Sequence, residues 1–384
     1  MNIVIYTNIL TPYRTCFFEE MYDECKKQGI GFHVLVMADT ESGRSWHYKD
    51  FQTEYTILLH CKTFSRGETH IHYNNNLKDA LRSINPDIIV CAGSYLCPGI
   101  WTILQLKKRF KYKVLFWSES HLNESRSYSG IKVRIREIIR NTIYKKFDGF
   151  WYAGKLSKEL IQTYCSPNAK LMFMPNLVDG EVYKKARYFS DDYKAMIKNA
   201  YQLDKKKIIF ICPARLIPVK GIDKFIPIFA QTINKKDATL LIAGTGEQET
   251  LLQKLIKDYQ IDVRLLGYKD QKEMVDLYSI SDYFVLPSIS DANPLTCIEA
   301  LWVGLPLLIS ENCGNYPEVI KQGVNGFSFD YKEPNKIVEV LDRLIVADSG
   351  WKRAAKVESI RIVEEKYDSK LVVKRILKQL ISIK

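Results

Sequence analysis

The chain has 384 residues, of which 46% are hydrophobic and 26% are charged, and its formal net charge is +12. This length exceeds one ordinary hydrophobic core, so we expect two domains. The composition excludes a low-complexity or disordered chain. The positive charge favours an anionic partner, whether a membrane surface, a nucleic acid or a phosphorylated substrate, without choosing among them.

Nine cysteines are scattered along the chain and none forms a C-x-x-C pair, so neither a disulfide framework nor a zinc site is indicated. Residues Met1 to Tyr6 are typical of a first strand and lack the basic region of a signal peptide. No apolar run approaches the roughly 18–20 residues needed to cross a bilayer. We therefore expect a cytoplasmic protein that is soluble or lies on a membrane surface.

Short apolar runs alternate with helical patterns through the first half of the chain. The expected strands are Ile3–Tyr6, Phe32–Met37, Ile88–Cys91, Val114–Trp117, Phe150–Trp151 and Leu171–Met174. The expected helices between them are Phe17–Gln28, Leu77–Ile84, Ile100–Phe110 and Lys155–Tyr164. Strand–helix alternation predicts right-handed crossovers and a parallel sheet.

The alternation restarts after a charged stretch that ends at Lys207. The second set of expected strands is Ile208–Cys212, Thr239–Ala243, Val263–Leu266, Tyr283–Leu286 and Leu307–Ser310. We place the domains at residues 1–178 and 179–364, and expect a terminal helix near 365–384 that packs back on the first domain. Two such domains would leave a cleft between them, where ligands commonly bind.

Residues 131–147 form a basic amphipathic helix pattern, in which isoleucines alternate with arginines and lysines. Its cations and aliphatic side chains suit an anionic membrane surface. A helix packed on the sheet with a solvated basic face is an equal alternative.

Arg215 and Lys220 lie five residues apart in a loop that leaves an expected strand. Two fixed cations at a strand end suit a diphosphate, because Arg offers a planar fork of donors and Lys a compact charge. The alternative is a surface loop with ordinary basic residues.

Gly244 and Gly246 follow another strand, but Glu249 stands where a dinucleotide-binding motif has its third glycine. A tight turn between strand and helix is therefore the first interpretation, and a ligand contact is the second.

The stretch from Pro287 to Glu318 contains the main candidate ligand site. Asn293-Pro294 opens an expected helix, whose free N–H groups and positive dipole end form an anion site. Asp291 precedes this helix, and Glu299 is expected about two turns into it. Two carboxylates beside an anion site suit a ligand with phosphates and hydroxyls, such as a nucleotide-sugar. Alternatively, Asp291 is only a cap and Glu299 a solvated helix residue.

Together these motifs resemble, in order, those of family 4 retaining glycosyltransferases. The motifs are Pro175-Asn176-Leu177-Val178-Asp179, Arg215 with Lys220-Gly221, Gly244-x-Gly246, Leu266-Gly267-Tyr268, Pro287-Ser288, Asp291 with Glu299-Ala300, Gly304-x-Pro306 and Gly314 with Pro317-Glu318. The resemblance covers residues 175–330 and, more loosely, the N-terminal domain.

The resemblance implies the α/β GT-B fold, with two Rossmann-like, doubly wound parallel-sheet domains facing a central cleft. It implies that Arg215 and Lys220 bind the donor diphosphate, that Glu299 holds the ribose and that Asp291 holds hydroxyls of the transferred sugar. The other implied donor contacts are the glycines Gly244 and Gly246 and the backbone of Gly267 and Tyr268 at the base. The segment Asn293, Pro294, Leu295 and Thr296 would offer its backbone N–H groups, of which Pro294 has none, to a phosphate. Family members need no cofactor and no metal, and no Asp-x-Asp metal motif occurs in this chain.

The chain departs from the family in three places. Asp291 stands where Glu is usual, and Ala292-Asn293 stands where Gly and an aromatic residue are common. The glycine-rich turn after the first strand is absent, so Arg14 becomes a candidate for a phosphate contact. On the N-terminal side, Glu119 and His121 follow a strand and are candidates for contacting the reacting sugar or the acceptor.

We therefore expect a retaining, metal-independent hexosyltransferase-type enzyme, with a UDP-sugar as the expected donor and a glycan or lipid-linked saccharide as acceptor, in synthesis of bacterial surface polysaccharide. The expected alternatives are a GT-B sugar-nucleotide epimerase or phosphorylase and a non-catalytic GT-B-like binding subunit, because fold does not fix function. A nucleic-acid partner is not expected, since no helix-turn-helix, RRM or zinc pattern occurs.

Overall fold

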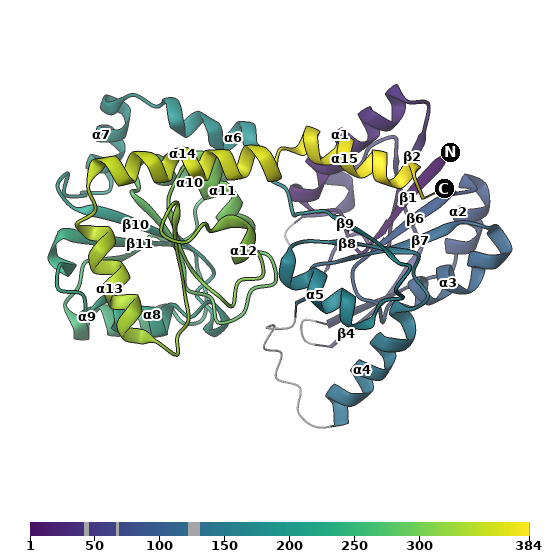
Figure 1. Ribbon diagram of the computed structural model, residues 1–384, viewed down its shortest axis with the longest axis horizontal. Helices are drawn as coiled ribbons and strands as arrows, with labels where there is room; N and C mark the ends of the chain where they lie inside the picture. The colour runs from purple at the N-terminus through teal and green to yellow at the C-terminus, as the bar shows by residue number, and fades with distance from the viewer. Residues whose placement is uncertain (42–45, 67–68, 122–130, 384) are drawn as a thin grey trace. The chain divides into compact units, whose positions relative to one another are not determined.

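The computed structural model describes residues 1–41, 46–66, 69–121 and 131–383. The chain divides into two compact units. The N-terminal unit holds the described residues up to Val178 together with those from Ser369 onward, and the C-terminal unit holds Asp179–Asp368. Each unit is built around its own parallel sheet (Figure 1).

The N-terminal unit has a seven-stranded parallel sheet in the order β3-β2-β1-β6-β7-β8-β9. In chain order, its strands are β1 (Asn2–Thr7), β2 (Gly31–Val36), β3 (Thr56–Leu58), β6 (Ile88–Ala92), β7 (Lys113–Ser118), β8 (Gly149–Tyr152) and β9 (Lys170–Phe173). Its helices are α1 (Pro12–Lys27), α2 (Leu77–Ile84), α3 (Pro98–Phe110), α4 (Ile131–Tyr144), α5 (Lys155–Tyr164) and α15 (Ser369–Ile381). The middle residues of the central strands are apolar, as expected for a sheet covered on both faces, and residues 3–6 of β1 are fully buried.

An antiparallel hairpin of β4 (Cys61–Arg66) and β5 (Thr69–Asn74) adds to this unit. The strand β3 and the hairpin are not among the sequence-based expectations. Phe64, Ile71 and Tyr73 are exposed, whereas His72 and Asn74 are buried. This hairpin therefore reverses the usual apolar-in, polar-out alternation, which is why its strands lack the expected sequence pattern.

The C-terminal unit has a six-stranded parallel sheet in the order β12-β11-β10-β13-β14-β15. Its strands are β10 (Ile208–Pro213), β11 (Ala238–Ala243), β12 (Val263–Leu265), β13 (Tyr283–Leu286), β14 (Leu307–Ser310) and β15 (Gly326–Phe329). Its helices are α6 (Gly180–Lys184), α7 (Asp191–Ala200), α8 (Ile222–Phe229), α9 (Glu249–Tyr259), α10 (Gln271–Ile280), α11 (Leu295–Val303), α12 (Tyr316–Val319), α13 (Pro334–Ile345) and α14 (Ser349–Lys366). Helices lie on both faces of the sheet (Figure 1).

The long helical pattern at the end of the chain is divided in two. Helix α14 ends at Lys366, and α15 starts at Ser369 and packs on α1 and β9 of the N-terminal unit. The guanidinium of Arg375 fixes this contact, since it donates to the Phe173 carbonyl at 3.2 Å and lies over the Phe173 ring. Across the described residues, no helix combines the length and apolar composition needed to span a bilayer.

Candidate functional site

The strand order of the C-terminal unit places a reversal point beside β10. This strand lies between β11 and β13. The chain adds β11 and β12 on one side of β10 and then returns to add β13, β14 and β15 on the other side. In open parallel sheets, ligands bind beyond the carboxyl ends of the strands at such a point. The two loops that follow β10 and β13 are residues 214–221 and 287–294, and they contain the predicted site residues Arg215, Lys220, Asp291, Asn293 and Pro294.

These two loops are joined by backbone contacts. The Val219 carbonyl accepts hydrogen bonds from the N–H groups of Ile289 at 2.8 Å and Ser290 at 3.4 Å. The Tyr331 hydroxyl lies beside both loops and donates to the Pro287 carbonyl at 2.7 Å, with the Gly221 carbonyl at 3.2 Å as a second acceptor for the same hydrogen. The loops therefore form one supported platform.

Lys220 and Asp291 form an ion pair across this platform. The Lys220 ammonium donates to Oδ2 of Asp291, and the two side chains are only 19% and 15% exposed. The Asp291 backbone is held as well, because its carbonyl accepts from the N–H of Gly314 at 2.8 Å. The predicted diphosphate-binding cation and the predicted sugar-binding carboxylate are thus neighbours, and each neutralises the other in the protein without ligand.

The backbone on both sides of Arg215 packs against Gly244 and Gly246. Gly244 has φ +151°, and a Cβ there would overlap the Ala214 carbonyl; a Cβ on Gly246 would overlap the Leu216 carbonyl. The N–H of Leu216 donates to Thr245 O at 2.9 Å. The glycines therefore allow close packing under Arg215, whose side chain is exposed.

Helix α11 begins at Leu295, with Pro294 as its N-cap. This corrects the expectation that Pro294 lies inside the first turn, and it places Glu299 a little more than one turn into the helix instead of about two. The Asn315 amide donates to Pro294 O at 2.9 Å and fixes the helix start. The first N–H groups of α11 have no carbonyl partner within the helix and can meet an anion.

Asn293 is 8% exposed, yet its amide Oδ1 and Nδ2 have no hydrogen-bond partner in the part of the chain that the structure describes. A buried amide without partners is costly, so such groups commonly meet a ligand or water. Sequence analysis assigned Asn293 a backbone role only. The burial of its side chain depends on tertiary packing that the sequence pattern does not display.

We expect Asn293→Leu to raise the free energy of unfolding by about 1–2 kcal/mol, because a similar-sized apolar side chain replaces a buried amide without partners. Urea denaturation measures this change. The control is Asn325→Leu, since the buried Asn325 amide bonds Val319 O at 2.9 Å and Lys321 N at 2.7 Å. Comparable destabilisation of both variants would contradict the account.

Glu299 accepts a hydrogen bond from the Tyr278 hydroxyl at 2.7 Å and a second from Tyr183. Burial raises the pKa of the Glu299 carboxyl above its ordinary value, and the two tyrosine hydroxyls partly oppose this shift. The side chain is therefore a restrained, partly buried acid rather than the solvated helix residue of the alternative interpretation.

The raised pKa of Glu299 gives a pH dependence of stability. A carboxyl whose pKa is higher in the folded than in the unfolded state stabilises fully below the unfolded value, and this stability is lost as pH rises through the folded pKa. We expect Glu299→Gln and the wild type to have the same melting temperature near pH 4. As pH rises toward pH 8, the melting temperature of Glu299→Gln should exceed that of the wild type by a growing margin. Thermal melts across this range test the difference. The exposed Glu339→Gln variant is the control, and an equal trend in both would refute the explanation.

Gly267 and Tyr268 lie beyond β12 at the same sheet edge. Gly267 has φ +70° with no heavy atom within 4 Å of a Cβ built there, and its carbonyl accepts from the N–H of Gly244 at 2.8 Å. Tyr268 is 76% exposed. The backbone at this position is open to an approaching planar group.

In the N-terminal unit, Glu119 and His121 follow β7 as expected. Arg14 donates to Glu119 Oε1 at 3.0 Å and to Thr7 Oγ1 at 3.0 Å, and its guanidinium lies 4.6 Å from the Trp117 ring centroid. His121 is buried. Arg14 is therefore paired with Glu119 in the protein without ligand, and the phosphate contact considered for it stays a prediction.

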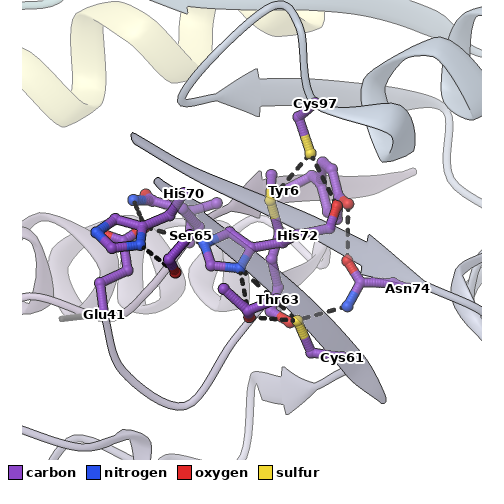
Figure 2. A network of polar contacts seen from close by, with 12 residues as sticks. Tyr6, Glu41, Cys61, Thr63, Ser65, His70, His72, Asn74 and Cys97 are labelled. Carbon is purple, nitrogen blue, oxygen red and sulfur yellow. Dashed lines mark hydrogen bonds and ion pairs between the residues drawn. The ribbon is translucent and has the colours of Figure 1, made fainter. Parts of the chain in front are cut away.

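Sequence reasoning missed a polar network on the inner face of the hairpin (Figure 2). The His72 ring contacts two side chains. Its Nε2 lies 3.0 Å from Oε1 of Glu41, and its Nδ1 lies 2.9 Å from the Thr63 hydroxyl. Asn8 also donates to Glu41 Oε1 at 2.8 Å. Burial opposes ionisation, but these hydrogen bonds hold the pKa of Glu41 below its ordinary value. The alternating polar residues of 70–74 were the signal in the sequence.

Comparison with known proteins identifies relatives of this chain. Residues 194–358 match the family model described as glycosyl transferases group 1. Over 170 residues the chain is 32% identical to an uncharacterized glycosyltransferase of Methanocaldococcus jannaschii, covering 43% of this chain and 42% of that protein. It is 29% identical over 161 residues to N-acetyl-alpha-D-glucosaminyl L-malate synthase of Bacillus anthracis, covering 42% and 40%. The chain thus spans about two fifths of the length of these curated relatives.

Among solved structures, Anabaena Alr3699/HepE in complex with UDP matches with a TM-score of 0.76 and 16% identity, covering all of both chains. At this identity the likeness concerns the fold. With the two doubly wound parallel sheets, it confirms the expected GT-B fold class.

Proposed function

We propose, from the membership of residues 194–358 in the glycosyl transferases group 1 family, that this chain transfers a sugar from a nucleotide-sugar to a glycan or lipid-linked acceptor. The observation that carries the proposal is the Lys220–Asp291 ion pair on the loop platform that precedes helix α11. It brings together a cation for a diphosphate, a carboxylate for sugar hydroxyls and free helix N–H groups.

In this proposal the donor diphosphate replaces Asp291 as the partner of Lys220. Arg215, Lys220 and the first N–H groups of α11 then surround the diphosphate, which gains negative charge as the bond to the sugar breaks. Positive groups fixed beforehand stabilise that developing charge. Oδ2 of Asp291, no longer bonded to Lys220, can then accept hydrogen bonds from hydroxyls of the transferred sugar.

The remaining assignments are part of the same proposal. Glu299 holds the ribose, the open backbone of Gly267 and Tyr268 meets the base, and a UDP-sugar is the proposed donor. Because three sources of positive charge already face the diphosphate, we propose that transfer needs no metal. Retention of anomeric configuration is part of the proposal, and Glu119 and His121 remain the proposed contacts to the reacting sugar or acceptor.

The experiment is incubation with UDP-glucose, UDP-galactose, UDP-N-acetylglucosamine and GDP-mannose, each with extracted bacterial lipid-linked saccharides, followed by NMR of the products. A new glycosidic bond with the donor's anomeric configuration supports the proposal. Conversion of one free nucleotide-sugar into its epimer would favour the alternative epimerase. Binding without turnover of any donor would favour a non-catalytic subunit.

Helix α4 supports a membrane-bound acceptor and a site of action in synthesis of surface polysaccharide at the cytoplasmic face of the membrane. Ile135 and Ile138 are 50% and 66% exposed, and Arg134, Lys145 and Lys146 are exposed beside them. The side chains of residues 131–133, also in the predicted basic range, lie outside the described residues. An exposed apolar stripe flanked by cations suits an anionic bilayer surface.

We expect the protein to co-sediment with vesicles containing phosphatidylserine at low salt, and less at high salt, because salt screens the attraction. The Ile135→Ser/Ile138→Ser variant should bind several-fold more weakly, since its apolar contacts are removed. The exposed Ile233→Ser variant in the C-terminal unit is the control, at 87% exposure. Equal sedimentation of all three proteins would exclude α4 as the membrane contact.

A further inference from the structure

Two tyrosine hydroxyls converge on Glu299 from different helices. Tyr278 of α10 donates to Oε2 at 2.7 Å, and Tyr183 of α6 also bonds the carboxylate. Tyr278 is fully buried and Tyr183 is 5% exposed. Their rings meet edge to face, with centroids 6.2 Å apart. Buried tyrosine hydroxyls with one shared partner form a rigid clamp, because neither ring can turn without losing its contacts.

The clamp is built into the packing of this unit. Helix α6 lies tightly on α11, where a Cβ on Gly180 would stand 2.6 Å from the Trp302 ring. The Asp179 carboxylate caps α6 by accepting from the Glu181 N–H at 3.0 Å. Tyr183 is therefore placed by a glycine contact and a capped helix start.

Helix α10 is fixed independently. Tyr193 of α7 donates to Asp276 at 3.2 Å, and Asp270 and Glu273 form a capping box at the start of α10, with Oδ1 accepting from the Glu273 N–H at 2.8 Å. The position of Tyr278 thus does not depend on Glu299. Both hydroxyls are preorganised, and the carboxylate adopts the orientation that they impose.

We propose that Tyr183 and Tyr278 are positioning residues that orient the Glu299 carboxylate toward the donor ribose and so set the preference for ribonucleotides over 2′-deoxyribonucleotides. This inference rests on the proposed function. A carboxylate offers about four lone-pair sites. Two are occupied by the tyrosines, and the others can accept the 2′- and 3′-hydroxyls of the ribose.

The electrostatics give the clamp a second effect. Burial raises the pKa of Glu299, and the donated hydrogen bonds counter it by stabilising the charged form. Of the other ionisable groups nearby, the Cys297 thiol is buried on α11 itself and Asp179 lies beside Tyr183. Arg187, packed beside α11, is paired with Glu364 of α14 at 3.1 Å. Among the described residues, the two tyrosines are therefore the groups that hydrogen-bond this carboxylate.

The test is calorimetric titration of UDP, dUDP, GDP and dGDP into the wild type and into Tyr183→Phe, Tyr278→Phe and Glu299→Gln. Tyr283→Phe is the matched control, because its buried hydroxyl donates to Leu344 O at 2.8 Å within the same unit. We expect each clamp variant to lose about ten-fold in affinity for the preferred ribonucleotide, the worth of one hydrogen bond to a charged group, and to lose less affinity for its deoxy analogue, which keeps only the 3′-hydroxyl contact. Tyr283→Phe should behave as the wild type.

A pH series separates positioning from general damage. In Tyr278→Phe the preference for the ribose form should recover as pH rises, because Glu299 loses a hydrogen-bond donor to its charged form and ionises at higher pH. The inference would be overturned if the clamp variants kept the wild-type ratio of ribonucleotide to deoxyribonucleotide affinity while Glu299→Gln lost it. An equal, pH-independent loss of affinity for ribonucleotide and deoxyribonucleotide would also overturn it. A wild type that binds no nucleoside diphosphate would instead contradict the proposed function itself.

Discussion

Lys220→Ala is expected to lower the rate of sugar transfer by about two to three orders of magnitude, the usual cost of removing one fixed group that stabilises developing charge. Lys220 is a compact cation at the end of a short 3₁₀ turn, Pro218–Lys220, and its position is fixed by Asp291. Its removal leaves the diphosphate less stabilised as it departs. It also leaves Asp291 unneutralised beside an anionic ligand, so donor affinity should fall as well.

The matched control is Lys207→Ala. Lys207 pairs with Asp262 at 2.9 Å, with the two side chains 25% and 22% exposed, close to the exposure of the Lys220–Asp291 pair. It precedes β10, at the opposite end of the strand from the candidate site. Steady-state kinetics should show near wild-type turnover for Lys207→Ala at similar folding stability. Equal losses in the two variants would mean that Lys220 acts through stability alone.

Gly221→Ala is the second change with a large expected effect. Gly221 has φ +65°, and a Cβ there would overlap the Pro287 carbonyl and stand 3.0 Å from the Tyr331 hydroxyl. Left-handed strain and displacement of Pro287 together should lower the free energy of unfolding by about 2–4 kcal/mol. The displacement separates the two loops of the platform, so nucleotide binding should weaken even in protein that remains folded.

Gly323→Ala measures the cost of a left-handed backbone at alanine without the overlap of a Cβ with a neighbouring carbonyl. Gly323 lies in the same unit with φ +76°, and its nearest neighbour is a Phe327 ring carbon 4.0 Å from a Cβ. This variant should lose only about 1 kcal/mol, the cost of a left-handed alanine. Urea denaturation, with binding measured below the transition, compares the two. Losses of the same size would show that contact with Pro287 does not matter.

Much of the fold could be predicted because its signals are local. Strand β13 and helices α2 and α5 have the predicted bounds, and the buried strands of both sheets are apolar runs that need no partner to be recognised. Strands β3 and β15 and the hairpin were missed. The hairpin exposes Phe64 at 66% and buries His72, so its polarity pattern is the reverse of a half-buried strand, and only tertiary contacts reveal which face is inside.

The candidate site was predictable to the same extent. Arg215, Lys220 and Asp291 each follow a strand end, so their placement at one sheet edge follows from parallel topology. The partners of Glu299 could not be predicted. Tyr278 lies 21 residues before it and Tyr183 lies on another helix, and only the packing of α6 and α10 on α11 joins them. The start of α11 lies one residue later than predicted, because the extended backbone angles of Pro294 make it the N-cap.

The central claim is that Arg215, Lys220 and the start of α11 together hold a diphosphate. Calorimetric titration of uridine, UMP and UDP, and of the guanosine series, into the wild type and into Arg215→Ala and Lys220→Ala tests it most directly. We expect the wild type to bind one diphosphate at least ten-fold more tightly than its monophosphate, as charge-assisted hydrogen bonds to the second phosphate require, and both variants to lose most of that advantage. Equal affinity of the wild type for monophosphate and diphosphate, or an advantage that survives in both variants, would contradict it.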